Sequence, residues 1–131
     1  FRAMLFGILI TFLVQSSSIT TSLVVPLAGA GILKLRQIFP YTLGANIGTT
    51  MTSILASLAT GTIQSLSVAF GHLLFNIFGI VLIWPIPQLR NIPIKLASQF
   101  AELATQNKVY PFLYIFIVFF VIPLILITIV R

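Results

Sequence analysis

The sequence contains very little charge. Only 6% of its 131 residues are charged, a single one of these is acidic, and none of the residues is cysteine. A soluble domain usually carries about a quarter charged residues, so this composition excludes a soluble enzyme. The lack of cysteine excludes a disulfide scaffold and thiol chemistry. Apolar residues take the place of the charged ones and make up 59% of the chain.

The basic residues, which give a net charge of +6, are scattered along the chain. A nucleic-acid-binding protein gathers such residues into a patch or groove, so no nucleic-acid partner is expected. Three stretches contain no Lys, Arg, Asp or Glu at all: residues 3–33, 37–89 and 109–130. About 20 apolar residues span a hydrocarbon core about 30 Å thick. The stretches therefore predict an all-α integral membrane protein that resides in a lipid bilayer.

Two full membrane spans follow from the simplest of these stretches. Residues 110–131 are apolar or aromatic up to Val130, and Pro123 is expected to kink this helix. Residues 65–84 form the other span, which ends where Trp84 is followed by proline.

The segment between these spans, residues 85–109, is the one conventionally polar part of the chain. Leu96, Phe100 and Leu103 recur there at helical spacing, while polar side chains occupy the other faces. This pattern predicts an amphipathic helix that lies in the membrane interface.

The first stretch, residues 3–33, is apolar on both sides of a polar run at residues 15–22. One helix of this length would measure roughly 46 Å at 1.5 Å per residue, which is too long for one span. Two short legs that meet at the polar run avoid this problem. The sequence thus predicts a re-entrant helical hairpin whose two ends lie on the same side of the membrane.

Residues 38–60 show a second polar interruption, from Gly44 to Ser53. Two glycines and an asparagine permit non-helical backbone, so a broken transmembrane helix is predicted, with a new helix starting at Thr49. The alternative is helix packing, because Gly44 and Gly48 form a GxxxG pattern.

The basic residues orient these segments. With a re-entrant hairpin and one broken span, six of the seven basic residues lie on one side of the membrane. By the positive-inside rule this side is cytoplasmic, which places residues 85–109 in the cytoplasm. A single span over residues 3–33 would segregate the charges less well.

The two polar interruptions predict a binding site for two ions. A helix that restarts at Ser17 or Thr20 would direct free N–H groups at an anion, and the hydroxyls of residues 16–18 add donors. Oxygens of Gln15, Thr49 and Thr52 suit a small cation. Neither interruption contains an ionisable group, which favours a substrate bound together with a metal cation over a proton relay. Discontinuous helices of this kind are typical of secondary transporters.

Purely structural explanations compete with the interpretation as an ion-binding site. Clusters of Ser, Thr and Gly in membrane helices often serve only to pack helices together. His72 shares a helix face with Asn76, and an intramembrane ionisable residue is a functional candidate. A neutral histidine bonded to a neighbouring helix explains it equally well, so the role of His72 stays open.

With these residues in view, the chain resembles the type II sodium-dependent phosphate cotransporters. The motif Gln-Ser-Ser-Ser at residues 15–18 and the motif Asn-Ile-Gly-Thr at residues 46–49 match the twice-repeated signature of that family. His72, the Phe-Asn pair at 75–76, the Trp-Pro-Ile-Pro run at 84–87 and Ile-Pro-Ile-Lys at 92–95 are similar to the family's second repeat.

The resemblance implies Na⁺-coupled symport of inorganic phosphate by alternating access, with Na⁺ as coupling ion and no other cofactor. It identifies residues 1–84 as the second cotransport repeat, in a multi-pass protein of the plasma membrane. The implied phosphate-binding residues are Ser16, Ser17, Ser18 and Asn46. The implied sodium-binding residues are Gln15, Thr49, Thr50 and Thr52.

The chain departs from the family in lacking the first of the two inverted repeats. It begins on Phe1 and enters an apolar run at once, so we expect a piece of a longer protein, half of a transporter, whose missing repeat completes the site. Two alternatives stay open. One is a Na⁺ symporter of another oxyanion, such as sulfate or a carboxylate. The other is a membrane assembly or sensor module that transports nothing.

Overall fold

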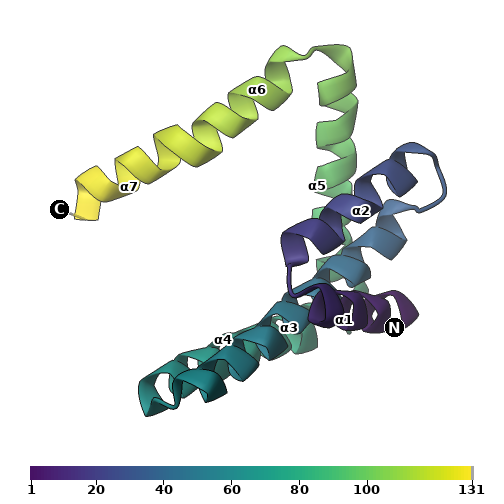
Figure 1. The fold of residues 1–131 in the computed structure, drawn as a ribbon. Coiled ribbons are helices and arrows are strands. Elements are labelled where there is room, and N and C mark those ends of the chain that lie inside the picture. The colour runs from purple at the N-terminus through teal and green to yellow at the C-terminus, as the bar shows by residue number, and fades with distance from the viewer. Residues whose placement is uncertain (131) are drawn as a thin grey trace. The chain divides into compact units, whose positions relative to one another are not determined.

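The computed structural model describes residues 1–130, and every regular element in that range is a helix, as the sequence predicted (Figure 1). In chain order they are α1 (Arg2–Val14), α2 (Ser17–Gly29), α3 (Leu35–Thr60), α4 (Ile63–Ile83), α5 (Pro87–Gln106), α6 (Val109–Phe116), the π-helical turn η1 (Ile117–Val121) and α7 (Ile122–Val130). The chain divides into two units, Phe1–Asn91 and the residues from Ile92 onward. Each unit is described by itself.

The first polar run interrupts the helix where the sequence predicted an interruption. Helix α1 ends at Val14, Gln15 adopts a left-handed conformation with φ of 57°, and Ser16 is extended. Helix α2 then begins at Ser17, capped by the Ser16 hydroxyl, which accepts a hydrogen bond from the Ile19 amide at 3.3 Å. The prediction of two helical legs is thus confirmed, while their re-entrant course in a membrane stays a prediction.

The second predicted interruption is wrong. Helix α3 continues without a break from Leu35 to Thr60, and Thr49 lies inside it. The glycines that suggested irregular backbone serve instead for close packing. A Cβ at Gly44 would collide with the backbone of Met4, and a Cβ at Gly48 would lie 2.7 Å from the Cβ of Thr11.

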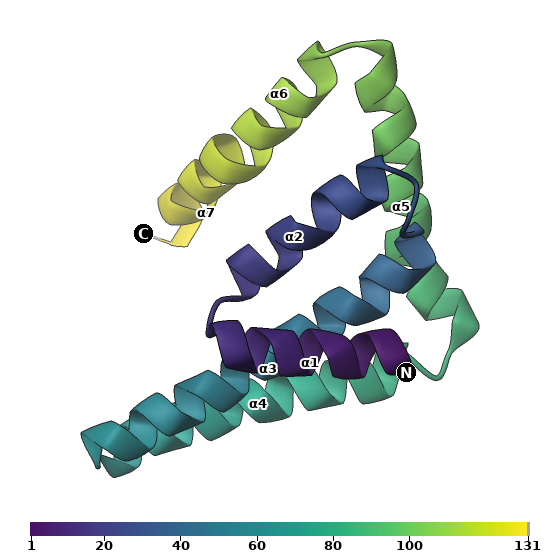
Figure 2. The same ribbon diagram turned by 45° about the vertical axis from the view of Figure 1, so that its right-hand side comes forward.

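Helix α1 packs closely on α3, and Figure 2 shows the two helices lying against each other. A glycine of α1 also permits this close packing, because a Cβ at Gly7 would meet the carbonyl of Tyr41. Small residues let helix backbones approach in this way. The alternative interpretation of Gly44 and Gly48 as a GxxxG packing motif is therefore confirmed.

Helices α3 and α4 form a tight antiparallel hairpin. Gly61 ends α3 in the left-handed conformation with φ of 68°, and Thr62 caps α4 by accepting a hydrogen bond from the Ser65 amide at 3.3 Å. Helix α4 ends at Ile83 with Trp84 as its C-cap, within one residue of the predicted end. The Trp84 ring stacks on Phe39 with centroids 6.5 Å apart, and the Arg90 guanidinium lies 5.3 Å above it.

Two helices are long and apolar enough to cross a membrane, in agreement with the two predicted full spans. Helix α4 has a mean hydropathy of 2.2, and the helix over Val109–Val130 has a mean hydropathy of 3.1. The predicted end of the latter span, Arg131, lies outside the described residues.

The second unit contains the distortion expected at Pro123 and most of the amphipathic helix. The distortion takes the form of the π-helical turn η1, which ends at Val121, two residues before the proline. Proline lacks an N–H and its ring crowds the preceding turn, and the wider π turn relieves both. Helix α5 confirms that the polar segment is helical, and its Phe100 contacts Tyr114 of α6 at 4.8 Å between centroids.

The glycine contact predicts that Gly44→Val destabilises the protein that contains this chain. The added side chain would meet the backbone of Met4, which cannot move aside as a side-chain end can. Overpacking of this kind costs about 1–3 kcal/mol, so the unfolding temperature in detergent should fall. At Gly71 of α4 a Cβ would meet no other described atom within 4 Å. Gly71→Ala should therefore unfold at or above the wild-type temperature. Equal unfolding temperatures for Gly44→Val and wild type would contradict the contact.

Candidate functional site

The end of α1 and the start of α2 meet at Gln15 and Ser16, and Figure 2 shows the short link that joins the two helices. The last carbonyls of α1 lack intrahelical amide partners; that of Thr11 accepts a hydrogen bond from the Gln15 amide at 2.7 Å. The first amides of α2, at Ser17 and Ser18, lack intrahelical acceptors. The negative end of one helix dipole and the positive end of the other thus point at the same short link. Such a link can bind a cation and an anion together.

The three serines that follow Gln15 lie at the positive end. The Ser16 hydroxyl oxygen accepts a hydrogen bond from the Ile19 amide, so its own proton is free to be donated. Ser17 is half-buried and Ser18 is exposed. The structure therefore groups the three predicted serines at one helix N-terminus, where their hydroxyl and amide protons suit an oxyanion.

The threonines of α3 offer the opposite chemistry. The Thr49 hydroxyl donates to the Ala45 carbonyl at 3.0 Å, and the Thr52 hydroxyl donates to the Thr49 carbonyl at 2.7 Å. A hydroxyl that has given its proton to its own helix presents oxygen lone pairs to any further partner. Such oxygens suit a cation and not an anion.

The register of α1 on α3 directs the carbonyl end of α1 toward the threonines of α3. Gly7 of α1 lies against Tyr41 and Ala45, and Thr11 lies against Gly48, so the two helices advance in the same direction along their contact. Residues four apart share a helix face. Thr52 is therefore the next residue on this face of α3, and Gln15 directly follows the end of α1. Both are among the four residues predicted to bind sodium.

Two other predicted residues lie apart from this group. Asn46 and Thr50 are each two positions from a residue on the α1 side, which is about 200° around a helix. Thr50 is fully buried and donates to the Ile47 carbonyl at 2.7 Å. Asn46 lines a cavity of about 100 Å³ together with Asn76 of α4. The structure does not bring these two residues to the link at Gln15.

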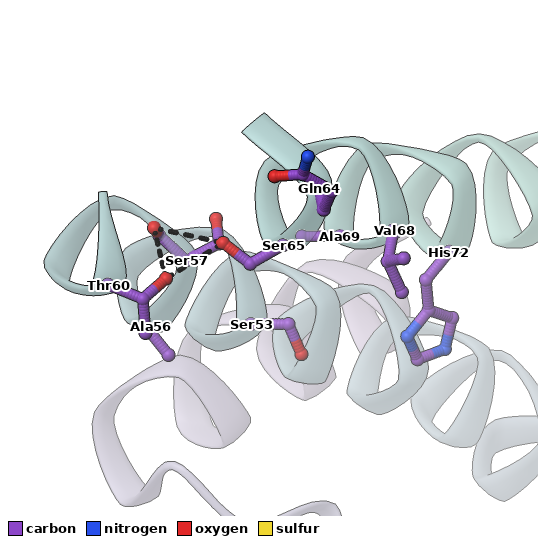
Figure 3. Close-up of a pocket in the computed structure, with 9 residues that line it drawn as sticks. All are labelled: Ser53, Ala56, Ser57, Thr60, Gln64, Ser65, Val68, Ala69 and His72. Carbon is purple, nitrogen blue, oxygen red and sulfur yellow. Dashed lines mark hydrogen bonds between the residues drawn. The ribbon is translucent and has the colours of Figure 1, made fainter. Parts of the chain in front are cut away.

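Sequence reasoning missed a larger groove of about 540 Å³ between α3 and α4, drawn in Figure 3. Small and hydroxyl-bearing side chains line most of it. The lining residues are Ser53, Ala56, Ser57, Thr60, Gln64, Ser65, Val68, Ala69 and His72. Hydroxyl residues at 53, 57 and 60 recur at helical spacing, and this signal could have revealed the groove. His72 faces this groove, whereas Asn76 lines the smaller cavity.

Within residues 1–130, no group of three or more His, Cys, Asp or Glu side chains could hold a metal ion. The same residues do offer neutral oxygens to which a cation could bind. Hydroxyls, side-chain amides and carbonyls at a helix C-terminus are the groups that supply them here.

Comparison with known proteins agrees with this chemistry. Residues 1–101 match the sequence model of a family described as Na⁺/Pi-cotransporter. The chain is 44% identical over 127 residues, 95% of its length, to sodium-dependent phosphate transport protein 2B of Bos taurus, of which it covers 18%. It is 41% identical, again over 95% of its length, to protein 2C of Rattus norvegicus, of which it covers 21%. It is 40% identical over 92% of its length to protein 2A of Oryctolagus cuniculus, of which it covers 19%.

The chain thus spans about a fifth of the length of the curated relatives it matches. No solved structure matches the chain.

The left-handed backbone at Gln15 predicts an unusual order of stability among substitutions. Gln15→Gly and Gln15→Ile both remove the amide, but only glycine adopts φ of 57° without strain. The isoleucine variant should be less stable by about 1–2 kcal/mol, measured as thermal unfolding of the full-length protein.

Gln99, inside helix α5, provides the matched control for this prediction. There the order should reverse, because glycine in a helix interior costs about 1 kcal/mol relative to the best helix formers. The same ranking at both positions would contradict the left-handed link.

Proposed function

The chain belongs to the Na⁺/Pi-cotransporter family, and we propose that the protein containing it carries inorganic phosphate across a membrane together with Na⁺. The relatives are named as sodium-dependent phosphate transport proteins, which supports transport over catalysis. The observation that carries the proposal is the link at Gln15 and Ser16, where the carbonyl end of α1 meets the amide end of α2.

The direction of the hydroxyl hydrogen bonds supports the division of roles. Ser16, whose proton is free, would donate to phosphate with Ser17 and Ser18. Thr49 and Thr52, whose protons are already donated to α3, would offer oxygen to Na⁺ together with Gln15. Asn46 and Thr50 are left out of this set because they lie on other sides of α3.

Coupling of phosphate binding to Na⁺ binding would follow from the lack of positively charged side chains in these stretches. Residues 3–33 and 37–89 contain no Lys or Arg that could neutralise phosphate, and helix N-termini supply only partial positive charge. Binding an anion in a membrane without a counter-charge is costly. A Na⁺ ion held at the carbonyl end of α1 would provide that charge, so that each ion strengthens the binding of the other.

The chain would form half of the transport site. One hairpin supplies one set of donors, and the rest of the longer protein would supply the other half as an inverted repeat that permits alternating access. We further propose that the hairpin is re-entrant in the plasma membrane and that residues 85–109 are cytoplasmic. The positions of six of the seven basic residues support this orientation.

Uptake by the full-length protein in sealed vesicles tests the transport proposal. Radiolabelled phosphate should enter with Na⁺ outside, and replacing Na⁺ by K⁺ or choline should reduce entry to the level of empty vesicles. Undiminished entry would refute coupling to Na⁺. Excess unlabelled sulfate or dicarboxylate serves as the control for substrate class, and effective competition by either would favour another oxyanion.

Single substitutions in the same protein should weaken phosphate binding and Na⁺ binding independently. Ser17→Ala should raise the phosphate concentration for half-maximal uptake by about tenfold, the equivalent of about 1.4 kcal/mol of binding. Thr49→Val should instead raise the half-maximal Na⁺ concentration by a similar factor. Thr105→Val, in the polar helix α5, removes the same kind of hydroxyl outside the site and should change neither value. Wild-type values in both site variants would indicate that the clusters only pack helices.

A further inference from the structure

Thr11 has a buried hydroxyl whose hydrogen-bonding capacity is unused. The residue is 0% exposed, and its Oγ1 has no hydrogen-bond partner within residues 1–130. Every other threonine of the chain donates its hydroxyl proton to an oxygen nearby. These are Thr20, Thr21, Thr42, Thr49, Thr50, Thr52, Thr60, Thr62, Thr105 and Thr128. A buried polar atom without a partner destabilises a fold, so the exception at Thr11 points to a missing ligand.

The surroundings of Thr11 restrict what that ligand can be. The Cβ and the methyl group of its side chain lie against Gly48, in the close contact between α1 and α3. Because these helices already bury the residue completely, a further segment of the longer protein has no access to it. The partner must be small enough to enter the contact, which leaves an ion or a water molecule.

The electrostatics favour a cation. Thr11 lies one turn before Gln15, at the carbonyl end of α1, where the helix dipole is negative. A water molecule in a protein interior needs at least two polar partners, and a cation binds the unpaired carbonyls of such a helix end more strongly than water does. Gly48 lies one turn before Thr52, so Thr11 and the proposed sodium-binding residues share one face of the contact.

We propose that Thr11 Oγ1 is an additional ligand of the Na⁺ ion held by Gln15, Thr49 and Thr52, so that the cation site begins one turn deeper in α1 than the polar run. This inference rests on the proposed function. It also explains why threonine occupies a position in the middle of the glycine contact, where valine would fill the same space.

The test is Thr11→Val in the full-length protein. Valine has the shape of threonine without the oxygen, so the half-maximal Na⁺ concentration for phosphate uptake should rise by about tenfold. In Na⁺-free buffer the valine variant should unfold at or above the wild-type temperature, because the unpaired hydroxyl is gone. Na⁺ stabilises whichever state it binds, so adding Na⁺ should raise the unfolding temperature of wild type more than that of the variant.

Two further variants keep the outcome interpretable. Thr11→Ser retains the oxygen and should keep nearly wild-type Na⁺ dependence. Thr42→Val removes a hydroxyl that is bonded within α3 and should leave Na⁺ dependence unchanged. If Thr11→Val does not reach the membrane, Thr11→Ala, which also lacks the oxygen, should show the same loss of Na⁺ affinity.

Unchanged Na⁺ dependence in Thr11→Val, with wild type remaining Na⁺-dependent, would overturn this assignment alone. Loss of Na⁺ dependence already in wild type would instead overturn the proposed function.

Discussion

The contact between α1 and α3 is the interaction on which the rest of the first unit depends. In lipid there is no hydrophobic force that drives two apolar helices together, so close packing of small residues has to supply the association. Gly7, Gly44 and Gly48 let the two backbones approach until side-chain and backbone atoms touch. This contact holds the carbonyl end of α1 beside the threonines of α3.

That fixed helix end would allow the proposed binding site to be built without charged residues. A buried lysine or arginine in a membrane would be costly and would keep its full positive charge whether or not phosphate is bound. Partial charges at helix ends avoid both problems, because they attract an ion only while the ion is within about one turn. The abrupt link at Gln15 and Ser16 matters for this reason. A continuous helix would use the same amides and carbonyls in its own hydrogen bonds.

The sequence was sufficient to predict this link but not the course of α3. Gln15 and Ser16 lie in a polar run that no single span accommodates, and serine is a strong helix-capping residue, so local chemistry decides the outcome. Gly44 and Gly48 are ambiguous, because the same glycines permit a break or a close contact. Only the partner helix decides between them, and its register is not visible in the sequence. Adjacency in a motif also says nothing about helix face: Thr50 precedes Thr52 by two positions, which is about 200° around α3.

The direction of the hydroxyl hydrogen bonds is even harder to predict from the sequence than the course of α3. Serine and threonine carry the same hydroxyl, which can serve a cation through its lone pairs or an anion through its proton. Ser16 caps a helix as an acceptor and keeps its proton, whereas Thr49 donates its proton to its own helix and keeps its lone pairs. In the proposed site, position relative to a helix end, and not residue type, would therefore decide which ion each hydroxyl binds. A site of neutral hydroxyls can in this way bind opposite charges side by side, with the backbone determining which oxygen serves which ion.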